Sequence, residues 1–189
     1  MAALLPPVVP AGFLASTPQP TLAADGLTLR PWRAGDAPYL VEAYEDETIR
    51  RWHVRSMSDP EAHAWINGRA ARWAAETGAD WAVTEHGVPV GRLGLKQLDL
   101  VDGAAEVAYW VLPAARGRAV APRAVAALTR WCFTDLGLHR LEILHSTANE
   151  ASCRVAAKAG FAYEGTKRQE GLHADGWHDM HLHARLHDD

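Results

Sequence analysis

The sequence predicts a single α/β domain whose mixed, mostly antiparallel sheet of about seven strands is flanked by about four helices. Two observations lead to this fold class. Residues 81–112 read as strands in series, separated by short turns. From residue 105 onward the pattern becomes strand, helix, strand, helix and strand, which is typical of a mixed α/β sheet. We find no internal repeat and no linker, so one domain is expected.

Each expected strand rests on alternating polarity or on a short apolar run between turn residues. The strands are expected at residues 27–32, 81–84, 88–98, 105–112, 140–146 and 177–186. His86 and Gly87 form the turn that joins the second and third of them into a hairpin, and residues 101–104 hold the next turn.

Each expected helix has apolar residues at helical spacing or a clear boundary signal. The helices are expected at residues 36–50, 58–77, 122–136 and 151–159. Ser58 and Glu61 match a capping box at the start of the second helix, with Pro60 at an early helical position. Gly78, Gly137 and Gly160 end the last three helices.

The composition indicates a soluble globular protein that does not bind nucleic acid in general. The 189 residues are 48% hydrophobic and 22% charged, with a formal net charge of −4, and the sequence pI is about 6.2. A local basic patch at Arg116, Arg118 and Arg123 remains an alternative. The two cysteines, Cys132 and Cys153, suggest no disulfide framework, so a reducing cytoplasm is expected.

The first part of the chain is a proline-rich arm, expected over residues 1–22, with the folded domain over residues 23–189. Five prolines interrupt the arm, and no Lys or Arg precedes Arg30, so neither a membrane helix nor a secretory signal is expected. We expect the arm to be flexible or loosely docked, on the body of the domain or on a second subunit. A monomer or a homodimer fits the sequence equally well.

The loop at residues 116–121, Arg-Gly-Arg-Ala-Val-Ala, carries the strongest functional signal. It connects an expected buried strand to an expected helix. The first N–H groups of a helix lack intrahelical partners and favour an anion, and two arginines add positive charge. A Walker-type loop is excluded because no Gly-Lys-Ser/Thr follows. The loop therefore predicts a phosphate-binding site.

Several motifs together resemble the GNAT acetyltransferase superfamily. Arg116, Ala119 and Ala121 fall on its coenzyme A signature, Gln/Arg, two residues, Gly, one residue, Gly/Ala. Further motifs are Leu-Arg-Pro-Trp at residues 29–32, Ile-Arg-Arg-Trp at residues 49–52 and NEASCRVAAKAGF at residues 149–161. These resemble the RimJ/RimL branch of ribosomal-protein N-terminal acetyltransferases. The likeness covers about residues 24–187. Ala119 departs from the usual glycine, and its methyl group restricts the approach of a ligand to the backbone.

The resemblance implies acetyl-CoA as co-substrate, without a metal. It implies a pyrophosphate site at Arg116, Gly117, Arg118, Ala119, Val120 and Ala121, and a backbone donor for the thioester oxygen near Val111. It also implies that Asn149 binds the pantetheine arm and that Ser152 lies near the sulfur, where it can protonate the leaving thiolate. As an alternative, Asn149 and Ser152 act as helix caps, and residues 110–112 act only as core strand.

Two glutamates are candidates for the general base that neutralises the acceptor amine. Glu106 begins the central strand. Glu170 lies in an expected loop at residues 169–171 and aligns, by the resemblance, with an acidic residue used in some members of the branch. At pH 7 an α-amine of pKa about 8 is about 10% neutral, whereas a lysine of pKa about 10.4 is about 0.04% neutral. An N-terminal amine therefore demands less of the base.

The reaction expected is direct acetyl transfer to a primary amine, with the N-terminal α-amine of a protein or peptide as the main candidate. A small amine, such as an antibiotic or a polyamine, is the alternative acceptor. A different class, an acyl-CoA-binding module without catalysis, also fits the departure at Ala119. No nucleic acid or membrane partner is expected.

Ten histidines and Cys153 raise two further hypotheses. Five of the histidines lie near the end of the chain, but in a strand His181 and His183 share one face and His178 lies on the other. A local metal site is therefore not expected, and a histidine acting as base through water is more consistent with the pattern. Cys153 has no histidine in its own motif, which argues against a nucleophilic role. Trp52 is a candidate for the acceptor groove. Glu45 and Asp46 are candidates for attraction of a cationic acceptor, with a solvated helix face as the alternative.

Overall fold

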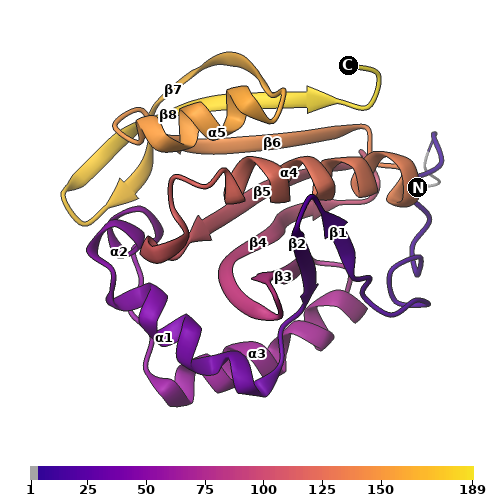
Figure 1. The fold of residues 1–189 in the computed structure, drawn as a ribbon. Helices are drawn as coiled ribbons and strands as arrows, with labels where there is room; N and C mark the ends of the chain where they lie inside the picture. Colours follow the sequence, from indigo (N-terminus) through magenta and orange to yellow (C-terminus); the bar gives the residue numbers. More distant parts are fainter. Residues whose placement is uncertain (1–3) are drawn as a thin grey trace.

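The computed structural model describes residues 4–189, which form one eight-stranded sheet with helices on both faces (Figure 1). The strand order is β1-β2-β3-β4-β5-β6-β8-β7. The strands are β1 (Leu22–Ala24), β2 (Leu27–Pro31), β3 (Ala79–Glu85), β4 (Val88–Asp99), β5 (Ala104–Val111), β6 (Arg140–Ser146), β7 (Ala162–His173) and β8 (Gly176–Leu186). The α-helices are α1 (Ala37–Glu45), α2 (Glu47–His53), α3 (Asp59–Ala74), α4 (Val120–Trp131) and α5 (Glu150–Lys158). Shorter turns are η1 (Ala34–Asp36), η2 (Pro113–Ala115) and η3 (Cys132–Leu136), the last a π-helix.

The predicted fold class is confirmed, and three differences in the elements have local causes. The helix expected over residues 36–50 breaks at Asp46, whose backbone is extended and whose carboxylate caps the Ile49 N–H at 2.9 Å. A short strand, β1, precedes the expected first strand and pairs with it. The segment around Glu170, expected as a loop, belongs to β7, although its pairing with β8 is irregular between Lys167 and Gly171.

The sheet is antiparallel except between β5 and β6, where it opens. These two strands pair in parallel only from Ala104 to Glu106 on β5, opposite Arg140 to Glu142 on β6. Beyond Glu106, β5 continues to Val111 and β6 to Ser146 without pairing to each other. A gap between two strands in the middle of a sheet leaves backbone groups free to meet a ligand.

Two hydrophobic cores cover the two faces of the sheet. One contains α4 and the buried face of α5, packed on residues such as Leu29, Leu93 and Ile143. The other contains α1, α2 and α3, packed on Trp32 and Trp110. Trp32 belongs to the Leu-Arg-Pro-Trp motif. The preceding Arg30 makes a buried, two-pronged ion pair with Asp36, at 2.6 and 2.8 Å.

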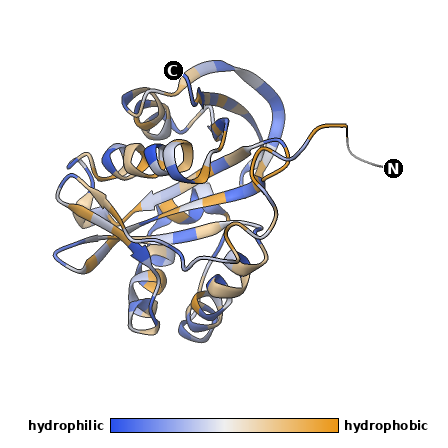
Figure 2. Cartoon of the chain, turned by 90° about the vertical axis from the view of Figure 1, so that its right-hand side faces the viewer, coloured by the Kyte–Doolittle hydropathy of each residue, from blue (hydrophilic) through white to orange (hydrophobic). Residues whose placement is uncertain are grey.

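The residues before β1 pack on the body of the domain. Val9 and Leu14 are 2% and 1% exposed. The carboxylate of Glu76, which follows α3, accepts the N–H groups of Gly12 and Leu14, both at 2.7 Å. The start of the described segment extends from the body (Figure 2). Leu4 is 99% exposed. Between residues 4 and 189, no helix is both long and apolar enough to cross a membrane.

A buried ionic network attaches α3 to the sheet. Asp80 of β3 is 1% exposed. Its Oδ2 accepts Arg69 Nη1 at 2.8 Å and Arg72 Nη1 at 2.7 Å, and its Oδ1 accepts Arg92 Nε at 2.8 Å. Three guanidinium groups therefore surround one carboxylate, which satisfies the buried charge through hydrogen bonds.

Candidate active site

A cleft of about 590 Å³ lies where β5 and β6 separate. Its walls come from the end of β5, the end of β6, helix α2, the loop before α4 and the start of α5. Among the residues expected at the site, the cleft is lined by Glu106, Val111, Arg116, Gly117, Ala119, Val120, Ala121, Asn149 and Ser152. Arg118 and Glu170 do not line it. Segments distant in the sequence thus converge on one cavity.

The edge of β5 presents backbone groups to the cleft at Val111. The next residue, Leu112, donates its N–H to Val90 O on the β4 side at 2.9 Å. Because successive N–H groups of a strand point to opposite edges, the Val111 N–H faces the gap left by β6. The Val111 carbonyl points the same way and accepts Arg116 Nε at 3.2 Å. The expected backbone donor therefore faces the cleft.

The loop before α4 turns sharply so that the N-terminus of this helix faces the cleft. Gly117 has φ of +77° and Ala119 has φ of +55°, both in the left-handed region. The second value explains why glycine is usual at that place, since a side chain is strained there. Val120 and Ala121, the first residues of α4, offer N–H groups that lack intrahelical partners. This arrangement suits a phosphate group.

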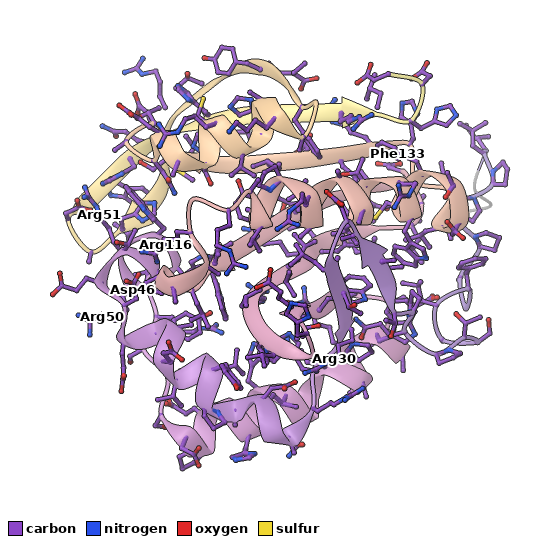
Figure 3. All side chains as sticks on the ribbon, viewed as in Figure 1. Arg30, Asp46, Arg50, Arg51, Arg116 and Phe133 are labelled. Carbon is purple, nitrogen blue, oxygen red and sulfur yellow. The ribbon has the colours of Figure 1, made fainter. Side chains whose placement is uncertain are left out.

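The two arginines of the loop have different partners. Arg116 pairs with Asp46 at 2.6 Å, which joins the loop to the corner between α1 and α2 (Figure 3). Partial burial alone would raise the pKa of Asp46, but the hydrogen bond from Arg116 and the Ile49 N–H lower it. Arg118 pairs with Glu85 of β3, outside the cleft. Asp46 is therefore engaged by Arg116, and attraction of a cationic acceptor by this residue stays a prediction.

Ser152 and Tyr109 form a hydroxyl pair across the cleft. Tyr109 Oη lies 3.0 Å from Ser152 Oγ. Burial raises the pKa of Tyr109 to about 12, so its hydroxyl keeps its proton at neutral pH. Asn149 is the N-cap of α5, and its Oδ1 accepts the Ser152 N–H at 3.2 Å. Asn149 thus takes the capping role, and the residue also lines the cleft. The Ser152 hydroxyl has the neighbour needed for proton transfer.

The two candidate bases occupy different environments. Glu106 is 5% exposed and pairs with Lys96 Nζ at 2.7 Å. Burial raises the pKa of Glu106 more than the nearby Lys96 ammonium lowers it. Glu170 lies on the surface, where it pairs with Lys167 at 3.4 Å. A carboxylate with a raised pKa at a cleft is suited to accept a proton near neutral pH.

Helix α2 supplies two aromatic side chains to the cleft. His53 Nε2 lies 3.2 Å from the Tyr109 carbonyl oxygen. Burial is the main cause that lowers the pKa of His53 to about 4, and the positive charge of Arg92 lowers it further. The ring of His53 is therefore neutral. Trp52 also lines the cleft, and its ring lies 5.7 Å from that of His173. Trp52 therefore lines the cleft, and its contact with the acceptor stays a prediction. Tyr109, Lys96 and His53 also line the cleft and were not expected from the sequence.

The histidines near the end of the chain fall into two groups. His178 belongs to the first, since its Nδ1 lies 2.7 Å from Ser146 Oγ and its Nε2 lies 2.9 Å from Asp175 Oδ1. Ser146 lines the cleft, so this row of side chains connects the cavity with the surface. His181 and His183 lie on the other face of β8, beside Cys153 and His145. As expected, His178 lies apart from them.

The fold and the cleft define a class of protein, the acetyltransferases whose open β5–β6 pair accommodates a coenzyme A thioester. The chain belongs to the GNAT acetyltransferase family, because residues 26–162 match the Acetyltransferase (GNAT) domain. The predicted family, enzyme class and co-substrate are confirmed. The protein is an acetyl-CoA-dependent N-acetyltransferase.

Individual relatives agree with this assignment. The chain is 31% identical over 158 residues to "Putative ribosomal N-acetyltransferase YdaF" of Bacillus subtilis, over 80% of this chain and 86% of that protein. Its fold matches that of RimL, a ribosomal L7/L12 alpha-N-protein acetyltransferase solved in complex with coenzyme A. The TM-score is 0.82 at 18% identity, over 88% of this chain and 98% of the other. RimJ of Mycobacterium smegmatis matches with a TM-score of 0.78 at 24% identity, over 88% and 86%.

Proposed function

We propose that this enzyme acetylates the N-terminal α-amine of a protein or peptide. The observation that carries the chemistry is the cleft between β5 and β6, which brings Glu106, the Val111 N–H and the Tyr109–Ser152 pair to one cavity. The acceptor class is supported by relatives named for ribosomal proteins, YdaF and the ribosomal-protein-serine acetyltransferase of Escherichia coli, the latter 27% identical over 97 residues.

Acetyl-CoA lies with its pyrophosphate at the loop before α4. The backbone N–H groups of Val120 and Ala121 hold the phosphate oxygens, and Arg116 adds charge when it releases Asp46. The pantetheine arm runs between β5 and β6 past Asn149, whose amide donates to it. In this pose the thioester oxygen accepts the Val111 N–H, and an oxyanion contact of this kind is worth about 3 kcal/mol.

Transfer proceeds directly from the thioester to the amine. Glu106 accepts a proton from the amine through water, and the neutral nitrogen forms a bond to the carbonyl carbon. As the tetrahedral intermediate collapses, its nitrogen loses a second proton to solvent, the carbon–sulfur bond breaks and the thiolate takes the Ser152 proton. Tyr109 returns a proton to Ser152, and solvent restores Tyr109. Glu106 releases its proton to solvent, so the enzyme ends the cycle unchanged.

Two features favour Glu106 over Glu170 as the base. Glu106 lines the cleft and has a raised pKa. Glu170 is exposed and does not line the cleft. A base of raised pKa is well matched to an α-amine, because that amine is already partly neutral at pH 7.

The acceptor is tested with matched peptides. The first peptide has a free N-terminus and no lysine. The second peptide differs from it only in a blocked N-terminus and in one internal residue, which is replaced by lysine. A polyamine and an aminoglycoside complete the panel. Thiol release and mass spectrometry should find rapid acetylation of the first peptide at its α-amine. Preference for a small amine would contradict the proposed acceptor, and thiol release no faster than without enzyme for every acceptor would favour a non-catalytic coenzyme A-binding module.

A further inference from the structure

Four metal-ligating side chains from three elements converge behind the cleft. His145 is on β6, His181 and His183 are on β8, and Cys153 is on α5. In the antiparallel pairing of β6 with β8, His145 lies directly opposite His181, and His183 is two residues further along β8 on the same face. Helix α5 brings Cys153 to that face. The convergence therefore depends on strand pairing and not on local spacing.

The separations are close to those of a coordination sphere. One ligand atom from each of the four residues lies within 4.8 Å of every other. Cys153 Sγ is 3.8 Å from His183 Nε2. A tetrahedral ion with metal–nitrogen bonds of about 2.0 Å and metal–sulfur bonds of about 2.3 Å holds its ligand atoms about 3.3–3.6 Å apart. Small side-chain rotations bring the four groups to these distances.

The cluster also lacks hydrogen-bond partners that its burial requires. His145 Nε2, His181 Nδ1 and His183 Nδ1 are buried and have no partner within residues 4–189. The other nitrogen of His145, Nδ1, lies 2.8 Å from the Ser146 carbonyl oxygen, so it carries the proton and leaves a lone pair on Nε2. Buried polar groups are normally paired. The orphaned Nε2 of His145 and Nδ1 of His181 indicate a missing ligand, and His183 turns its Nε2 toward Cys153.

The donor set selects the kind of ion. Three imidazoles and one thiolate suit Zn²⁺, and the same set also accepts Co²⁺. No carboxylate belongs to the cluster, which disfavours Mg²⁺ and Ca²⁺. The ring of Tyr163 lies 5.1 Å from that of His181 and 5.5 Å from that of His183, and it forms part of the cluster's wall.

We infer that His145, Cys153, His181 and His183 form a binding site for one Zn²⁺ ion. Binding displaces the thiol proton of Cys153 to solvent and forms four bonds between the ion and the protein. The ion joins α5 to β6 and β8. Because Cys153 follows Ser152, the site also fixes the start of the helix that carries the serine of the cleft. The acetyl transfer described above uses no step at this ion.

The test is metal titration of tag-free, chelator-treated protein with Co²⁺ and Zn²⁺. We expect one equivalent of Co²⁺ to give the strong visible bands of a tetrahedral site and a near-ultraviolet thiolate charge-transfer band, both displaced by one equivalent of Zn²⁺. Cys153→Ser should remove the charge-transfer band, and both Cys153→Ser and His181→Ala should weaken Zn²⁺ binding by at least about tenfold. His187→Ala, which removes an exposed histidine just after β8, is the matched control and should bind as the wild type does.

A second measurement needs no variant. Saturating Zn²⁺ should protect Cys153 from alkylation in the wild-type protein, and Cys132, which is fully buried, serves as the internal reference. Absence of saturable binding, equal weakening by His187→Ala, or alkylation of Cys153 at the same rate with and without Zn²⁺ would each overturn the inference. Melting temperatures in the presence of chelator establish that the variants are folded.

Discussion

Two buried carboxylates of the same sheet, Asp80 in β3 and Glu106 in β5, have opposite surroundings. Asp80 accepts hydrogen bonds from three arginines and lies under α3. Within residues 4–189, Glu106 has one ion-pair partner, Lys96, and it lines the cleft. Burial alone therefore does not distinguish a structural acid from a functional one. The number of partners and the access to a cavity distinguish the two acids. Variants of the two residues should therefore change different properties.

The largest effect is expected from Asp80→Ala. The substitution leaves three arginines beside a buried site without their common acceptor, which should destabilise the fold by about 3–5 kcal/mol. Chemical denaturation measures the loss. Asp102→Ala, in the exposed turn between β4 and β5, is the control and should change stability by no more than about 0.5 kcal/mol. A loss below about 1 kcal/mol for Asp80→Ala would contradict the structural role of the network and with it the contrast between the two acids.

Glu106→Gln should instead reduce activity. Loss of a general base lowers kcat by about 100-fold or more. The melting temperature should stay close to that of the wild type, because burial already disfavours the charged form of this side chain. Steady-state kinetics with a free N-terminal peptide measures the loss. Glu170→Gln makes the same change at the exposed candidate and should keep nearly full kcat; the reverse ranking would transfer the role of base to Glu170.

Ser152→Ala and Tyr109→Phe should each lower kcat by about tenfold, a modest effect because a thiolate is a good leaving group. Coenzyme A binding should change little. Since the two hydroxyls lie 3.0 Å apart and act in one relay, the double variant should lose little more than either single variant. Additive losses, or equal losses in coenzyme binding and in turnover, would contradict the relay.

Ala119→Gly should give the smallest effect. Alanine is strained at a φ of +55°, so glycine should stabilise the fold by about 0.5–1 kcal/mol and should bind coenzyme A slightly more tightly. Ala121→Gly, in the first turn of α4, has no such strain to relieve and should destabilise by about 0.5–1 kcal/mol. Isothermal titration and thermal melts measure both. Destabilisation by Ala119→Gly would show that the loop is not strained.

The coenzyme side of the site was predictable from the sequence because its signals are local. The loop at Arg116 and the Asn149 cap each lie within a few residues of a strand or helix boundary. The pairing of Lys96 with Glu106 was also within reach, since the turn at residues 101–104 places these residues opposite each other in β4 and β5. Tyr109 shares the cleft edge with Val111, two residues along the same strand.

The parts that were not predicted depend on contacts distant in sequence. Strand β7 is polar along most of its length and irregular around Glu170, so alternation does not reveal it. The sequence around Asp46 has the pattern of one continuous helix, and only the capping contact with Ile49 shows that the helix breaks there. The histidine and cysteine cluster requires the register of β6 with β8, which no local pattern contains.

The most direct test of the account is the ratio of wild-type to Glu106→Gln turnover as a function of pH. Ionisation of the acceptor amine affects both enzymes and cancels in the ratio. Glu106 acts as a base only when deprotonated, and its pKa is raised. The ratio should therefore be constant at high pH and should fall as the pH decreases through that raised pKa. A ratio that is independent of pH would contradict the assignment of Glu106 as the base of the acetyl transfer.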